Sequence, residues 1–101
     1  MGVSNQKIII VNKQQYGQKY LRIGNDEWKK AYKTLKPSSF ALYLYLASQE
    51  GNTLALGAVL IEQVLGIKKS AYHMAVNELE ENGYLKKEEG NTFIFTTKSN
   101  K

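Results

Sequence analysis

The most constraining feature of this chain is the stretch from Leu56 to Leu85, where two helical patterns flank a tight break at residues 65–67. In the second pattern the apolar residues are Tyr72, Ala75, Val76 and Leu79. Their i, i+3, i+4, i+7 spacing is that of an amphipathic helix with one buried stripe. The sequence therefore predicts two short helices joined by a glycine turn, of which the second buries only one face.

The opposite face of the second helix carries side chains suited to contacts with a partner. They are Lys69, Ser70, His73, Met74 and Asn77. A short helix, a glycine turn and a second helix with a hydrogen-bonding outer face describe the helix-turn-helix, whose second helix enters the DNA major groove. We therefore expect a helix-turn-helix over residues 58–82, with these five side chains near the bases and Lys68 holding a phosphate at the start of the second helix.

A β-hairpin is predicted directly after this helix. Asn82-Gly83 ends the helix, because glycine adopts the left-handed conformation that helix C-termini often need. The segments YLKKEE and TFIFTT follow, joined by a turn at Gly90-Asn91, and both are strand-like. We expect a hairpin over residues 84–97 that presents Lys86 and Lys87 to DNA phosphates.

The pattern G-I-K-K-S-x-x-x-x-A-V-x-E-L-x-x-x-G-Y-L from Gly66 to Leu85, with the hairpin behind it, resembles the winged helix-turn-helix superfamily. The run KTLKPSSFALYLYLAS at Lys33–Ser48 is similar to winged-helix domains of replication initiators from Gram-positive phages and plasmids. The resemblance covers roughly residues 20–97. It implies an α+β fold of three to four helices with a C-terminal wing, and sequence-specific binding of double-stranded DNA in replication initiation or transcription regulation.

The N-terminal part predicts strands. The β-branched run at residues 7–12 and the alternating run at 19–23 are expected to pair as a hairpin through residues 13–18. The unbroken apolar stretch Ile8–Val11 requires cover on both faces or a partner at its edge. We therefore expect a homodimer, built through this strand or through the helix that carries Trp28 and Tyr32. The alternative is a monomer whose strand packs on the winged core.

Three helical segments supply the scaffold, and the last of them is the first helix of the predicted helix-turn-helix. The first is capped by Asn25 or Asp26 and carries Trp28, Ala31, Tyr32 and Leu35 at helical spacing. The second begins at Pro37, is apolar nearly all round and ends at residues 50–51. The third covers residues 58–65, with Leu60, Ile61, Val64 and Leu65 facing inward and Val59 outside that stripe. The aromatic side chains are interpreted as core residues.

Length and charge fit one small basic domain. The chain has 101 residues, no cysteine and a net charge of +5, so no disulfide or thiolate metal site is expected. Residues 1–40 hold eight lysines and arginines against two acidic residues. We expect one domain at 7–97 with mobile ends at 1–6 and 98–101. No apolar run approaches the ~20 residues of a membrane span, so a cytoplasmic location without a membrane partner is expected.

Catalysis is not expected. Ser38-Ser39 follow proline at a helix start, where capping explains them, and the single histidine, His73, has no partners at a catalytic or metal-binding spacing. No cofactor motif surrounds Gly66.

Two alternatives to specific DNA binding stay open. One is a winged-helix module that binds and modulates a host replication, transcription or defence protein, for which Met74 is suited. The other is a structural module with weak, non-specific DNA affinity.

Overall fold

The protein has an α+β fold, as the sequence predicts. A computed structural model describes residues 7–11, 23–49 and 53–99. Within them the elements follow in the order β1 (Lys7–Val11), α1 (Asn25–Thr34), α2 (Pro37–Ala47), β2 (Thr53–Leu56), α3 (Ala58–Leu65), α4 (Lys69–Glu81), β3 (Leu85–Lys87) and β4 (Thr92–Phe95).

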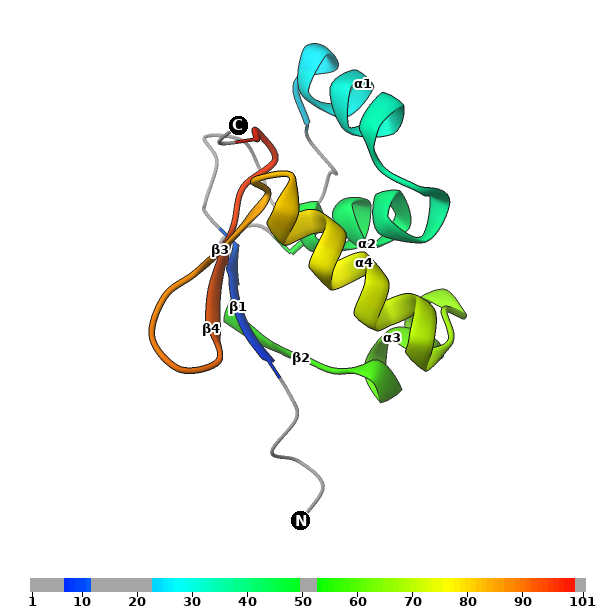
Figure 1. Cartoon of the computed structure of the whole chain (residues 1–101), viewed down its shortest axis with the longest axis vertical. Helices are drawn as coiled ribbons and strands as arrows, with labels where there is room; N and C mark the ends of the chain where they lie inside the picture. The colour runs from blue at the N-terminus through cyan, green and yellow to red at the C-terminus, as the bar shows by residue number, and fades with distance from the viewer. Residues whose placement is uncertain (1–6, 12–22, 50–52, 100–101) are drawn as a thin grey trace.

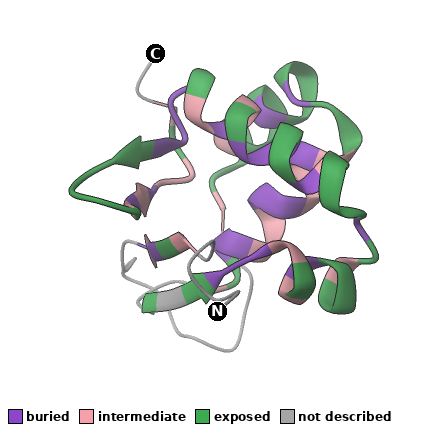
Figure 2. Ribbon diagram, turned by 60° about the horizontal axis from the view of Figure 1, so that its bottom comes forward, coloured by how far each residue is buried: buried purple, intermediate pink, exposed green. Residues whose placement is uncertain are grey.

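The four strands form one mixed sheet in the order β2-β1-β4-β3. β1 runs antiparallel to β2 and parallel to β4, while β3 and β4 form the predicted antiparallel hairpin. The helices lie on one side of this sheet, and their buried residues face it (Figures 1 and 2). The fold therefore has two layers with a single core between them.

The predicted pairing of the N-terminal strand is wrong. β1 lies inside the sheet, with Ile8 opposite Ala55 of β2 on one edge and opposite Thr92 of β4 on the other. The second strand predicted at residues 19–23 lies outside the described residues except for Ile23, which is not in a strand. Because both edges of β1 are occupied, this strand can neither form that hairpin nor offer an edge to a second copy.

The central position of β1 explains its unbroken apolar run. Ile9 and Val11 are buried against the helices, whereas Ile8 is 44% exposed and Ile10 is half-buried on the other face. The partner strand β2 was not predicted, because its four residues TLAL stand directly before a helix and are too few to show a period.

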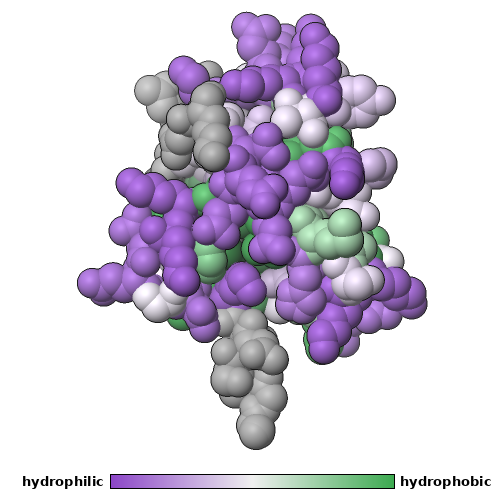
Figure 3. Space-filling view, viewed as in Figure 1, coloured by the Kyte–Doolittle hydropathy of each residue, from purple (hydrophilic) through white to green (hydrophobic). Residues whose placement is uncertain are grey.

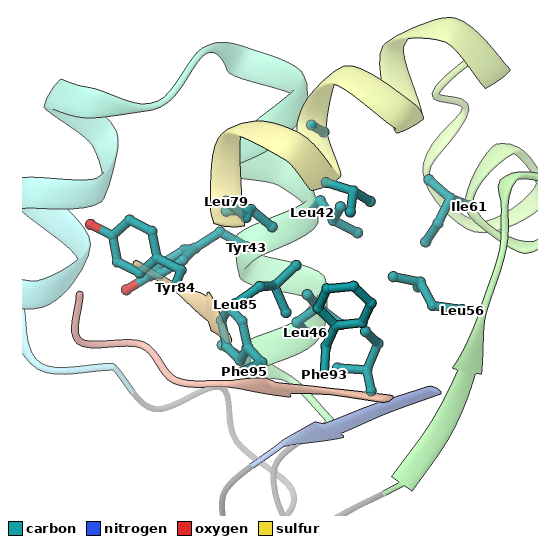
Figure 4. Packing of buried hydrophobic residues seen from close by; sticks show 14 of the residues in the cluster. Leu42, Tyr43, Leu46, Leu56, Ile61, Leu79, Tyr84, Leu85, Phe93 and Phe95 are labelled. Carbon is teal, nitrogen blue, oxygen red and sulfur yellow. The ribbon is translucent and has the colours of Figure 1, made fainter. Parts of the chain in front are cut away.

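Helix α2 lies at the centre of the core. Leu42, Tyr43 and Leu46 are fully buried, as the all-round apolar pattern predicts, although the helix ends at Ala47, earlier than expected. The Tyr43 ring meets Tyr84 and Phe95 edge to face, with centroids 5.2 and 5.7 Å apart (Figure 4). Its hydroxyl donates a 2.8 Å hydrogen bond to the carbonyl of Thr97. Tyr43 thus fastens α2 to the hairpin.

Helix α1 is more peripheral than predicted. Its cap is Gly24 rather than Asn25 or Asp26, and the Gly24 carbonyl accepts the N–H groups of Glu27 and Trp28. Ala31 is buried, but Trp28 is 37% and Tyr32 65% exposed, so the interpretation of these two rings as core is wrong. The reason is that α1 lies at one end of the molecule, where α2 covers only one of its sides (Figure 1).

Two smaller expectations also change. On α3, Ile61 is buried and Leu60 and Leu65 are partly so, but Val64 is 47% exposed, so the prediction that it faces inward is wrong. The C-terminal end was predicted to be mobile from residue 98 onward. The Ser99 hydroxyl nevertheless donates a hydrogen bond to the carbonyl of Asn82, so residues 98 and 99 are still attached to the domain. No helix of the described part is long and apolar enough to cross a membrane.

Two of the buried tyrosines, Tyr43 and Tyr72, should respond oppositely to the loss of the hydroxyl group. The Tyr72 hydroxyl is buried without a hydrogen-bond partner, whereas that of Tyr43 is bonded to Thr97. Tyr72→Phe should raise the free energy of unfolding by about 1 kcal/mol, because it removes an unsatisfied polar group. Tyr43→Phe should lower it by about 1 kcal/mol. Urea titrations of both variants measure this, and equal effects of the same sign would refute it.

Stability should fall in alkaline solution. Burial raises the pKa of Tyr72 from 10.0 to about 12 and also raises the pKa of Tyr43 and Tyr84. The unfolded chain therefore releases these protons at lower pH than the folded one does. The contribution of these protonated tyrosines to the free energy of unfolding is fully present below about pH 10, and it is lost as the pH rises through the pKa values of the folded state. Urea midpoints between about pH 8 and pH 11 should decline, and less steeply for Tyr72→Phe.

Candidate nucleic-acid interface

The turn between α3 and α4 fixes how α4 leaves α3. Gly66 has φ +73°, the left-handed conformation that glycine adopts without a steric penalty, and its N–H donates to the Glu62 carbonyl at 2.9 Å. Ile67 is buried in the core and anchors the turn. Lys68 follows as the N-cap residue of α4. The predicted helix, glycine turn and second helix are all present.

The buried stripe of α4 sets the rotation of the helix. Tyr72, Ala75, Val76 and Leu79 are buried, as the sequence predicts, and they face α2, α3 and the sheet. The opposite face must therefore point to solvent. All of the predicted base-contacting side chains are exposed there, namely Lys69, Ser70, His73, Met74 and Asn77.

This outer face is not uniform in charge. At 100° per residue, Ser70 and Asn77 lie at its middle, Lys69 and His73 on one flank, and Met74 toward the other flank. Glu81 is exposed one turn beyond Asn77 on the same side of the helix. The face is therefore positive at its N-terminal end and negative at its C-terminal end.

Lys68 is less available than the sequence suggests. Its Nζ lies 3.2 Å from the carboxylate of Glu62 on α3, across the turn. A surface pair of this kind contributes little to stability, and a phosphate can compete for the ammonium group. The pairing was missed because the two residues are six apart and become neighbours only when the turn reverses the chain.

The hairpin separates its two lysines. Lys86 stands opposite Ile94 and Lys87 opposite Phe93. Side chains alternate along a strand, and Phe93 is buried on the helix side. Lys87 therefore projects from the face of the hairpin that is nearer α4, and Lys86 from the other face. Glu88 and Glu89 follow them at the turn, which sequence reasoning did not weigh, so the exposed tip carries both signs of charge.

A groove runs beside α4, between it and the start of α2. It has a volume of about 490 Å³ and includes Lys36, Ser39, Met74, Asn77 and Glu81 in its lining. Met74 is 60% exposed at its edge. The facing surface is mainly hydrophilic, with a hydrophobic patch where α2 and α4 meet (Figure 3). Sequence reasoning could not find this groove, because its two walls are more than 30 residues apart in the chain.

Glu78, on the α2 side of α4, has a structural role. One of its carboxylate oxygens accepts the backbone N–H of Lys36 at 3.1 Å, just before α2 begins. This bond satisfies a donor that the start of α2 leaves free. It also joins the two walls of the groove, because Lys36 and Glu78 both line it.

Comparison with protein-family models, with curated proteins and with solved structures found no match to this chain. Among the described residues, no group of three or more histidine, cysteine, aspartate or glutamate side chains is arranged to hold a metal ion.

Proposed function

We propose that the protein binds double-stranded DNA sequence-specifically as a winged helix-turn-helix, with α3 and α4 as the helix pair, α4 as the recognition helix and β3-β4 as the wing. The role in replication initiation or transcription regulation, in a phage or plasmid, is proposed from the sequence resemblance alone. The strand order is compatible with this assignment, since β1 simply adds a strand between β2 and β4.

The observation that carries the proposal is the outer face of α4. It is a helix face of short polar side chains, held outward by a fully buried stripe and unobstructed by other described elements. Asparagine can pair bidentately with adenine in the major groove, and lysine can donate to guanine. A methionine beside them offers an apolar contact for a thymine methyl group. Asn77, Lys69 and Met74 provide these three kinds of contact within about two helical turns.

Phosphate contacts support the same placement. Lys68 and the first N–H groups of α4 lie together at the positive end of the helix dipole, where an anion is favoured. Lys87 projects from the hairpin face nearer α4. The acidic residues Glu81, Glu88 and Glu89 limit the surface that a phosphate backbone can approach. We therefore propose a short interface that extends along α4 from its N-terminal end to Asn77.

The second candidate function is binding of a host protein, and the groove beside α4 is what favours it. An exposed methionine next to an apolar hollow suits a protein side chain as well as a thymine methyl. Titration with specific and scrambled duplexes at several salt concentrations separates the candidates. Specific DNA binding retains a ratio between the two duplexes, while charge-driven binding shows a steep salt slope and no ratio.

Base readout is tested by Asn77→Ala and His73→Ala. Both residues are exposed, so neither change should unfold the domain. A good base contact is worth ~1–3 kcal/mol of discrimination, so each variant should lose about tenfold or more of the preference at one position. Selection of bound duplexes from a random pool, for the wild type and each variant, measures this. Identical selected motifs in all three proteins would remove α4 from the base-reading role.

The wing lysines provide a matched pair for the phosphate contact. Lys87→Gln should weaken binding to all duplexes alike and lower the magnitude of the salt slope by about one. Lys86→Gln, which changes the same charge on the other face of the hairpin, should leave the slope unchanged. Fluorescence anisotropy at four or more salt concentrations is the measurement. A larger effect from Lys86 than from Lys87 would reverse the proposed docking of the wing.

A further inference from the structure

A second surface, on α1, combines exposed aromatic rings with lysines. A pocket of about 450 Å³ opens between α1 and α2, and its lining consists of Ile23, Trp28, Tyr32, Phe40 and Leu44. It shares no lining residue with the groove beside α4. None of these lining side chains carries a charge. Trp28 and Tyr32 are the two most exposed aromatic rings of α1 and α2.

The rings of this pocket are held in place. Tyr32 meets Phe40 edge to face at 5.6 Å, and Phe40 in turn stacks on the buried Tyr43 at 5.7 Å. The indole N–H of Trp28 donates to Asn25 at 3.3 Å. Because Trp28 and Tyr32 are already oriented by these contacts, a flat ligand that stacks on them loses little side-chain entropy on binding.

Positive charge lies next to the rings. Lys29 and Lys33 follow Trp28 and Tyr32 by one residue each, so they form a parallel stripe on α1, and both are exposed. The Lys29 ammonium group is 6.0 Å from the centre of the Trp28 ring. Both acidic residues of α1 are in its first turn, and Glu27 is bonded to the Thr97 hydroxyl at 2.8 Å. The surface is thus complementary to an aromatic ligand that carries negative charge.

We propose that this α1 surface is a binding site for single-stranded DNA. Unpaired bases stack on Trp28 and Tyr32 at the mouth of the pocket, and the phosphates beside them contact Lys29 and Lys33. Proteins bind single strands through this combination of aromatic platforms and a basic track. A paired duplex cannot use the site, because its bases are already stacked on one another. The site goes beyond duplex recognition by α4 and uses none of the same residues.

Trp28 is the only tryptophan of the chain, so its fluorescence reports on this site directly. The full-length protein is titrated with a short oligo(dT) at low salt, and in parallel with an abasic oligonucleotide of equal length. We expect oligo(dT) to quench the emission and to bind about tenfold or more tightly than the abasic strand, the size of one lost stacking contact. Absence of quenching, or equal quenching by both strands, overturns the proposal.

Variants test which surface is responsible. Tyr32→Ala should weaken oligo(dT) binding about tenfold, and the double variant Lys29→Gln, Lys33→Gln should reduce the salt slope by about one to two. The double variant alters only exposed side chains, so it keeps the test valid if Tyr32→Ala disturbs the fold. Lys86→Gln is the control, because Lys86 is an exposed lysine of β3 that belongs to neither proposed site, and it should leave oligo(dT) binding unchanged.

Two outcomes of the variant series overturn the proposal. In the first, Asn77→Ala weakens oligo(dT) as much as Tyr32→Ala does, which would place the single strand on α4. In the second, sedimentation equilibrium shows self-association that Tyr32→Ala abolishes while oligo(dT) binding persists, which would make the α1 surface an interface between copies. Failure of duplex recognition by α4 has no bearing on these measurements, because the proposed sites share no residue.

Discussion

The packing of Tyr43 on α2 is the contact on which the rest of the fold depends. Its ring meets Tyr84 at the start of the hairpin and Phe95 on β4, and its hydroxyl is bonded to the Thr97 carbonyl. On its other side it stacks on Phe40, which supports Tyr32 on α1. One buried side chain therefore links the central helix, the C-terminal strand and the peripheral helix. Aromatic pairs of this kind contribute ~0.5–1.5 kcal/mol each beyond their buried area.

The sheet supplies the second constraint. β1 joins β2 to the hairpin, although these strands are separated by the helix pair in the sequence. By pairing with β4 in parallel, β1 holds the hairpin against the helical layer, and the N–H of Ile8 also donates to the carbonyl of Asn91 at the hairpin turn, at 3.0 Å. The hairpin therefore has a fixed orientation relative to α4, which is what allows Lys86 and Lys87 to be distinguished by the face from which they project.

The two proposed surfaces illustrate how local charge decides what a helix can bind. On α4 the lysine lies at the N-terminal end and the amide of Asn77 about two turns further on, while the last turn is acidic. On α1 the order is reversed along the chain, with acidic residues in the first turn and lysines after them, next to two accessible rings. Net charge alone does not distinguish these surfaces. The position of each acidic residue relative to the nearest lysine does.

The sequence by itself determined the elements with a strong local signal. The periodicity of α4, the glycine turn at Gly66, the proline at the start of α2 and the hairpin after Gly83 depend on neighbouring residues, so they could be predicted. The eight predicted site residues are likewise all exposed. Tertiary structure alone decided the partners of β1, the exposure of Trp28, Tyr32 and Val64, the ion pair of Lys68 with Glu62, and the groove between α2 and α4. Each of these depends on which distant segment covers a given face, and the period of one segment carries no information about its neighbour in space.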